Sequence, residues 1–289
     1  MFEGAYTALV TPFRRDGSVD TGKLRELVEL QIAGGIDGIV PVGTTGESPT
    51  LDVEEHVAVI RIVVETAAQR AKVIAGTGAN STAEAVELTR KARELGADGT
   101  LQVTPYYNKP TQTGLLRHFT AVADLGLPVV LYNVPGRSCC EIAISTIAEL
   151  AKHPHVVSVK EAAGSVDRVS RIKDVCDLEV LSGDDSLTLP MMAVGGCGVI
   201  SVASNLAPKA VADLVHAAAA GRWDEARALH ARYYRLFTDI FLETNPIPIK
   251  AAMEMAGLGE AVYRLPLCEM GADAREKLRA TLRKTGLLT

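Results

Sequence analysis

The sequence of 289 residues predicts an α/β fold, a (β/α)₈ TIM barrel followed by a C-terminal helical extension. Short runs of Val, Ile, Leu and Ala recur about every 20 to 35 residues, and a stretch with helical periodicity follows each run. The runs are apolar at nearly every position, which is typical of parallel strands covered on both faces. Eight such units occur without a glycine-rich first turn, which favours a closed barrel over an open doubly wound sheet.

The predicted strands are the apolar runs themselves. Right-handed crossovers through the intervening helices place consecutive strands side by side and parallel. The eight predicted ranges are residues 5–10, 38–42, 73–76, 100–104, 128–133, 156–160, 179–182 and 199–202.

Helix boundaries are marked by residues that favour caps. Asp20, Asp52 and Ser81 each precede a helical pattern and are good N-cap residues. Gly96, after Leu95, supplies a C-terminal stop for the third helix. We therefore expect helices to begin directly after these three residues.

The last part of the chain has no strand pattern. Residues 1–223 form the predicted catalytic barrel, and residues 224–289 form a helical region packed on the barrel or used for assembly. Two breaks interrupt the helical pattern, at residues 245–248 (NPIP) and at residues 257–259 (GLG).

The composition argues against several partners and locations. Lys and Arg total 30 against 35 Asp and Glu, a net charge of −5, so no basic excess exists to neutralise nucleic acid. Hydrophobic residues form 47% of the chain, yet no apolar run reaches the roughly 18 residues of a membrane span. The start lacks the features of a signal peptide, and five cysteines without a CxxC pair indicate reduced thiols. We therefore expect a cytoplasmic protein.

A metal site is not expected. The histidines avoid the strand ends, and the pair His153 and His155 precedes the sixth strand, at the opposite end of the barrel. Asp184 and Asp185 lack histidine support, so we expect a solvated loop or a substrate lid there. Two acids and no phosphate-binding turn at this place predict a small carboxylate substrate without phosphate.

Chemistry in such barrels gathers where the strands end and the following loops begin. Lys160 ends the sixth predicted strand, and an amine aimed into the barrel loses water, which favours the neutral form that makes a Schiff base. The alternative is a lysine that reaches out to water, and the position alone does not decide between them. Tyr132 ends the neighbouring strand, either as a proton shuttle for imine formation or as a rim aromatic.

Thr44 and Thr45 lie in a glycine-flanked turn after the second predicted strand. Their hydroxyl and N–H groups suit a small carboxylate. The alternative is a turn that only connects strand and helix tightly.

Motifs at several strand ends resemble those of a known family. Residues 43–47 (GTTGE), 132–135 (YNVP) and 160–161 (KE) resemble the lysine-dependent class I pyruvate aldolases, the family of N-acetylneuraminate lyase and dihydrodipicolinate synthase. The dihydrodipicolinate synthase branch is matched by Arg137 and by residues 104–110 (TPYYNKP), 182–185 (SGDD), 198–201 (GVIS) and 245–248 (NPIP). The resemblance runs from Gly4 to Leu288 at nearly the same spacing.

The resemblance implies a reaction without a cofactor. Lys160 is implied to form an imine with pyruvate, whose carboxylate is held by Thr44 and Thr45. Loss of a methyl proton gives an enamine that attacks L-aspartate 4-semialdehyde. Cyclisation then releases 4-hydroxy-tetrahydrodipicolinate for lysine and diaminopimelate biosynthesis. Tyr132 is implied to act as general acid and base, with Thr44 and Tyr107 completing a proton relay.

Further roles follow from the same resemblance. Arg137 is implied to pair with the carboxylate of the second substrate. The other implied substrate-binding residues are Ile200, Gly183 and Asp184. The residue that matches Tyr107 reaches into the neighbouring subunit's site in this family, which implies a homotetramer built as a dimer of tight dimers.

The resemblance also implies feedback inhibition by L-lysine at a second site. The matching positions carry groups suited to an amino acid, and they are Ser48, His56, Asn80, Glu84 and Tyr106. Pro49 and Val53 depart from the pattern of some lysine-sensitive members, so we expect partial inhibition.

One departure concerns the second substrate. The family usually continues after the arginine with Thr-Gly, whereas this chain has Ser138, Cys139 and Cys140, of which Ser138 keeps a hydroxyl to orient Arg137. Two alternatives stay open at this point. One is a sister aldolase that cleaves a 2-keto-3-deoxy sugar acid or N-acetylneuraminate, and the other is a non-catalytic ligand-binding relative.

Overall fold

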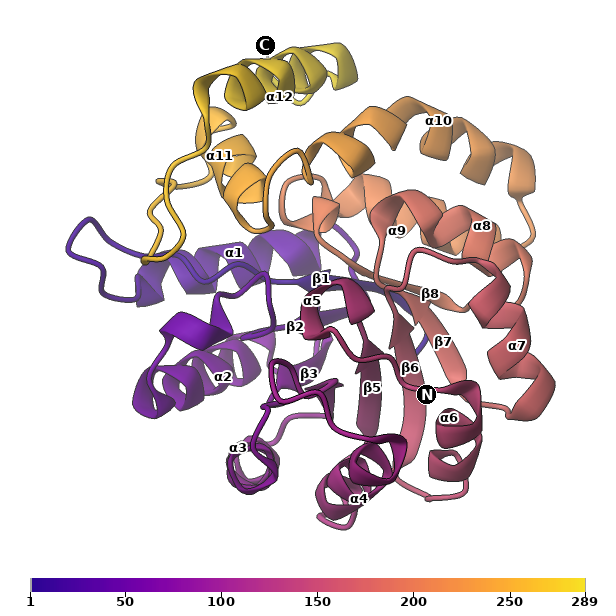
Figure 1. Ribbon diagram of the computed structural model, residues 1–289. Helices are drawn as coiled ribbons and strands as arrows, with labels where there is room; N and C mark the ends of the chain where they lie inside the picture. Colours follow the sequence, from indigo (N-terminus) through magenta and orange to yellow (C-terminus); the bar gives the residue numbers. More distant parts are fainter. Residues whose placement is uncertain (1, 289) are drawn as a thin grey trace.

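The computed structural model describes residues 2–288 and confirms the predicted fold class. Eight parallel strands within these residues follow one another in chain order and close into a barrel, with β1 paired to β8. Helices surround the barrel, as Figure 1 shows. The strands are β1 Gly4–Ala8, β2 Gly38–Val40, β3 Lys72–Gly76, β4 Gly99–Val103, β5 Val129–Asn133, β6 Val156–Glu161, β7 Glu179–Ser182 and β8 Gly198–Ser201.

Several strands begin earlier than the apolar runs predict. Gly4, Gly99 and Gly198 open β1, β4 and β8, although glycine normally indicates a turn. These glycines pair with residues of the neighbouring strands, and nearby atoms leave no room for a Cβ at any of the three.

The barrel helices cover the outer face of the sheet. Side chains that point outward, such as Ile39 and Val159, pack under the helices, whereas Val40, Ile74 and Ile200 fill the barrel interior. The helices are α1 Thr21–Ala33, α2 Val53–Ala67, α3 Thr82–Glu94, α4 Gln112–Ala123, α6 Ile144–Leu150, α7 Asp167–Val175, α8 Thr188–Ala193 and α9 Pro208–Ala219. Short α5 (Pro135–Ser138) and the 3₁₀ turns η1 (Ser48–Thr50), η2 (Asp185–Leu187) and η3 (Ala203–Asn205) lie in the loops after β5, β2, β7 and β8.

The predicted helix starts are confirmed. Asp20 accepts a hydrogen bond from the Lys23 backbone, and Asp52 forms a capping box with Glu55 at the start of α2. Ser81 holds the N-cap position of α3 without a capping side-chain bond. Gly96 follows α3 with φ of +85°, a conformation that glycine adopts without strain.

Three helices lie beyond the barrel: α10 (Trp223–Asp239), α11 (Ile247–Met255) and α12 (Ala272–Thr285). Figure 1 shows α11 and α12 at one side of the barrel, next to α1 and the end of α10. The break expected at residues 257–259 is much longer, because residues 256–271 form no helix. Arg264 explains the length, since its side chain bonds to Gly17 and Glu55 and holds this loop against the barrel.

None of the helices within residues 2–288 has both the length and the apolar character that a bilayer crossing requires.

Candidate active site

Strand register places the two central side chains together. Lys160 of β6 lies directly opposite Tyr132 of β5 in the parallel ladder. The Lys160 amine lies 4.2 Å from the centre of the Tyr132 ring, and the whole residue is only 5% exposed. Gly183 leaves room for it, because a Cβ at that position would come within 3.2 Å of Lys160 Cε. The lysine therefore stays inside the barrel and does not reach out to water.

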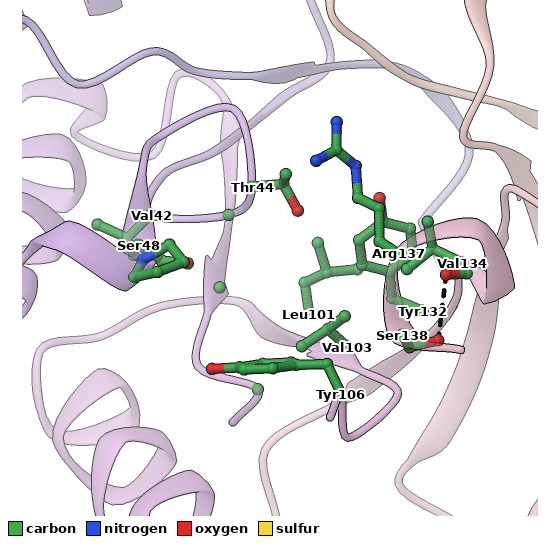
Figure 2. Close-up of a pocket in the computed structure, with 14 residues that line it drawn as sticks. Val42, Thr44, Ser48, Leu101, Val103, Tyr106, Tyr132, Val134, Arg137 and Ser138 are labelled. Atoms are coloured by element: carbon green, nitrogen blue, oxygen red, sulfur yellow. Dashed lines mark hydrogen bonds between the residues drawn. The ribbon is translucent and has the colours of Figure 1, made fainter. Parts of the chain in front are cut away.

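A cavity of about 200 Å³ opens at the C-terminal ends of β2 to β5. Figure 2 shows Thr44, Tyr132 and Arg137 at one side of this cavity and the ring of Tyr106 at another side. Lys160 is not among the lining residues, because its amine packs against the Tyr132 ring instead. The other lining residues are Val42, Gly43, Ser48, Pro49, Gly76, Gly78, Leu101, Val103, Val134 and Ser138.

The two threonines of the turn after β2 have different surroundings. Thr44 lines the cavity, whereas Thr45 is 3% exposed and is not among the lining residues. The Thr45 hydroxyl accepts a hydrogen bond of 2.9 Å from Asn245 Nδ2, from the segment before α11. The structure thus links this turn to the C-terminal helices, a contact that the sequence did not predict.

Arg137 lies on α5, with an exposed side chain at the cavity rim. Its Nη2 donates to the Asn245 carbonyl oxygen at 3.3 Å, which leaves further guanidinium donors free. The expectation that the Ser138 hydroxyl orients Arg137 is wrong. That hydroxyl donates to the carbonyl oxygens of Val134 and Cys140, because Ser138 is buried and turned toward the backbone of its own loop.

The loops after β7 and β8 are joined by a buried carboxylate. Asp185 accepts hydrogen bonds from the Ser201 hydroxyl and from the backbone N–H groups of Val202 and Ala203. Burial raises the pKa of Asp185 to about 6. The predicted solvated loop or lid is therefore wrong for Asp185, because this carboxylate ties two loops together.

Of the remaining predicted substrate-binding residues, Gly183 and Asp184 lie near Lys160. Gly183 and Asp184 are half-buried, and burial raises the pKa of Asp184 while the charge of Lys160 opposes this effect. Ile200 is fully buried in the barrel interior on β8 and does not line the cavity.

A buried polar cluster behind Lys160 was missed by the sequence analysis. Glu161, the next residue of β6, is fully buried and accepts hydrogen bonds from Asn133 Nδ2 at 2.9 and 3.1 Å. Arg168 Nε donates to the same carboxylate at 2.9 Å. A charged residue directly after Lys160 in an apolar strand is the signal that could have found this cluster.

The residues of the expected lysine site come together only in part. Ser48 and Tyr106 line the cavity, and the negative charge of Glu84 adds to burial in raising the pKa of Tyr106. The Asn80 carbonyl oxygen accepts a hydrogen bond from Asn108 Nδ2 at 2.8 Å. His56 is buried with Nε2 2.8 Å from the Gly76 carbonyl oxygen, and burial lowers its pKa.

Tyr107 does not reach the cavity of its own chain. Its side chain is 90% exposed, and its backbone has φ of +72°, an uncommon conformation for a residue other than glycine.

No cluster of three or more His, Cys, Asp or Glu side chains suited to a metal ion occurs within residues 2–288. His153 lies away from the cavity, with Nε2 3.1 Å from Asp124 Oδ1.

Comparisons with known proteins identify the family. The family model described as "Dihydrodipicolinate synthetase family" matches residues 1–285. The 4-hydroxy-tetrahydrodipicolinate synthase of Geobacter sulfurreducens is 53% identical over 291 residues, covering 100% of both chains. Two solved structures are also similar to this chain. The chloride-inhibited dihydrodipicolinate synthase of Acinetobacter baumannii complexed with pyruvate has 44% identity, a TM-score of 0.98 and coverage of 100% of both chains. The enzyme of Cyanidioschyzon merolae with lysine bound has 42% identity, a TM-score of 0.96 and coverage of 99% of both chains.

These comparisons confirm the expected activity, that of a 4-hydroxy-tetrahydrodipicolinate synthase, and the expected enzyme class, a lyase. They favour this activity over the two alternatives, a sugar-acid aldolase and a non-catalytic relative. The family model and the relatives extend over nearly the whole chain, and so do the motifs at the strand ends. This chain therefore belongs to the dihydrodipicolinate synthetase family.

Proposed function

We propose that this chain condenses pyruvate with L-aspartate 4-semialdehyde through a Schiff base on Lys160. The observation that carries this assignment is the Lys160 amine, buried at the end of β6 and held 4.2 Å from the Tyr132 ring centre. A lysine amine placed beside a group that can transfer protons is the nucleophile that forms a Schiff base with a keto acid. The neighbouring cavity of about 200 Å³ suits a small keto acid.

The reaction divides into steps that these residues serve. The Lys160 amine adds to the keto carbon of pyruvate and water leaves, which gives an imine. Tyr132, with Thr44 and Tyr107, transfers the protons of this step and removes a methyl proton to form the enamine. The enamine carbon attacks the aldehyde carbon of the second substrate. The amine of that substrate then displaces Lys160, closes the ring and frees the enzyme.

Two sets of donors hold the substrate carboxylates in this proposal. Thr44 and Thr45 bind pyruvate, and the Thr45 hydroxyl keeps its hydrogen for donation because Asn245 donates to its oxygen. Arg137 binds the carboxylate of the semialdehyde with the donors not used by Asn245. Gly183, Asp184 and Ile200 shape the space around Lys160.

Tyr107 acts across a subunit boundary in this proposal. Its 90% exposure supports a role outside its own chain, as does the fact that Tyr107 is not among the residues that line the cavity. We place it in the proton relay of a neighbouring subunit, within a homotetramer built from tight dimers.

L-lysine is the proposed feedback inhibitor. The lysine-bound relative supports this assignment, and so do Ser48 and Tyr106, which line the same cavity as Thr44 and Tyr132. A ligand that contacts Tyr106 would sit next to the relay residue Tyr107.

Borohydride trapping tests the central assignment. Reduction in the presence of pyruvate should add one reduced pyruvate to the peptide that contains Lys160, and Lys160→Met should abolish the adduct. Arg137→Ala should keep the adduct but lose about 10- to 150-fold in condensation, because one charge-assisted contact contributes roughly 1.5–3 kcal/mol. Mass spectrometry and a coupled condensation assay provide the two readouts.

The controls separate the possible failures. An adduct on another lysine, or none, contradicts the role of Lys160. Equal losses of trapping and condensation in Arg137→Ala would make Arg137 structural. Turnover with N-acetylmannosamine in place of the semialdehyde would point to the sugar-acid branch.

A further inference from the structure

A buried ion pair behind the Thr44–Thr45 turn has no place in the mechanism above. Glu47 is the last residue of the turn, and Lys250 belongs to α11, 203 positions away in the chain. Their side chains are 0% and 3% exposed, and the Lys250 amine donates directly to Glu47 Oε1. This ion pair connects the loop after β2 to the C-terminal helices.

Neighbouring groups also contact the Lys250 amine and the second carboxylate oxygen of Glu47. Lys250 Nζ also donates to the Val262 carbonyl oxygen at 2.8 Å and lies 4.3 Å from the centre of the Phe13 ring. Glu47 Oε2 accepts a bond of 3.4 Å from the Arg264 backbone N–H. Phe13, which follows β1, and the loop of residues 256–271 therefore enclose the pair. These contacts fix the positions of both side chains.

The turn that this pair anchors has a strained backbone at both ends. Val42 has φ of +50° and Glu47 has φ of +56°, a region that residues other than glycine rarely adopt and that is least favourable for a β-branched residue such as Val42. Such conformations persist only where the surroundings impose them. Thr11 Oγ1, which donates to the Gly46 carbonyl oxygen at 2.7 Å, and the Glu47–Lys250 pair provide contacts that do so.

Arg264 also contacts the residues that follow the turn. Its guanidinium donates to the Thr50 carbonyl oxygen at 2.7 Å and to the Glu55 carboxylate at the start of α2. The C-terminal loop thus holds both Glu47 and the 3₁₀ turn that follows it.

Stability alone is a poor explanation for this pair. A buried ion pair loses the hydration of both charges, and an apolar pair of similar volume is often as stable or more stable. An apolar pair, however, lacks the directed contacts that fix one backbone relative to another. We propose that Lys250 and Glu47 are positioning residues that hold the Thr44–Thr45 turn in its carboxylate-binding conformation. This inference rests on the proposed role of Thr44 and Thr45 in binding pyruvate.

Two variants separate positioning from folding. Lys250→Met leaves the Glu47 carboxylate buried without its partner, and the double variant E47M/K250M replaces the pair by apolar chains of similar length. We expect the melting temperature to fall in the single variant and to recover in the double variant. The KM for pyruvate should rise about ten- to hundredfold in both, with a smaller change in KM for the semialdehyde, because the misplaced turn contacts pyruvate.

The matched control is Lys209→Met, which breaks an exposed pair with Asp213 on α9 and should change neither quantity. A double variant that recovers both the melting temperature and the pyruvate KM overturns the proposal, even if the single variant does not fold. Borohydride trapping on the unchanged protein is run in parallel. Absence of that adduct would indicate failure of the proposed function rather than of the positioning role.

Discussion

The two ends of the barrel differ in the residues that form them: polar side chains surround a cavity at one end, and glycines open the strands at the other. At the mouth, where the strands end, Thr44, Tyr132 and Arg137 surround a cavity of about 200 Å³. At the floor, where the strands begin, β1, β2, β4 and β8 each open on a glycine, and a Cβ added to any of these four would lie within 2.6 Å of a neighbouring atom. The polar groups around the cavity distinguish the mouth, although Gly76 and Gly78 there are packed as closely as the glycines of the floor.

Two aromatic rings close the floor. Phe2 and Tyr6 meet edge to face with ring centres 6.3 Å apart, and both are 2% exposed. A Cβ on Gly38 would lie 2.2 Å from the Tyr6 ring, and one on Gly99 would lie 2.6 Å from the Phe2 ring. These two positions therefore require glycine, because the side chain of a larger residue would displace the ring.

The contrast teaches that stability and chemistry are separable in this molecule. The floor glycines leave no room for an added Cβ. At the mouth, by contrast, a polar group that faces the cavity can be removed without creating a clash. Changes at the floor should affect folding first, and changes at the mouth should affect turnover first. Variants at the two ends of the barrel test this division.

The floor should not tolerate Gly198→Ala. The new Cβ would lie 1.9 Å from the Gly4 carbonyl oxygen, and Gly198 has φ of +154°. We expect the free energy of unfolding to fall by more than about 3 kcal/mol, measured by denaturant unfolding, or the protein to be insoluble. Gly136→Ala at the mouth is the control, since nothing lies within 4 Å of its Cβ, and its stability should change by less than about 0.5 kcal/mol. Equal stability of the two variants would remove the distinction between the ends.

At the mouth, Tyr107→Phe should lower kcat about 100-fold without changing the melting temperature, because it removes one hydroxyl from the proton relay. Mixing this variant with Lys160→Met under conditions that exchange subunits gives a sharper test. If Tyr107 acts in the partner's site, mixed dimers contain one intact site and restore up to about a quarter of the activity. No recovery, with subunit exchange verified by mass, would place Tyr107 in its own chain's site.

The smallest effect is expected for inhibition by L-lysine. Glu84→Thr removes a carboxylate that faces Tyr106, so we expect uninhibited turnover to change less than about twofold while inhibition by millimolar lysine weakens about tenfold. Steady-state rates with and without lysine provide the measurement. Asp213→Asn, which changes an acid on the distant α9, is the control. Unchanged sensitivity in Glu84→Thr would mean that lysine binds elsewhere, and an uninhibited starting protein would mean that the site is not functional.

Features that depend on local pattern could be predicted from the sequence. Eight apolar runs and their helices specified the barrel, because strand and helix periodicities are properties of neighbouring residues. The N-caps at Asp20 and Asp52 were equally local. The pairing of Lys160 with Tyr132 followed once the strands were parallel and adjacent, since each residue is the last but one of its strand.

Features that join distant segments could not be predicted from the sequence and depend on the folded arrangement. The Glu47–Lys250 pair and the bond from Asn245 to Thr45 connect residues 203 and 200 positions apart, which no local pattern indicates. Asp185 looked like a solvated acid, but its partners come from the next loop. Gly4, Gly99 and Gly198 were not predicted as parts of strands, because the atoms that leave no room for a Cβ at these positions come from other segments and approach only after the barrel has closed.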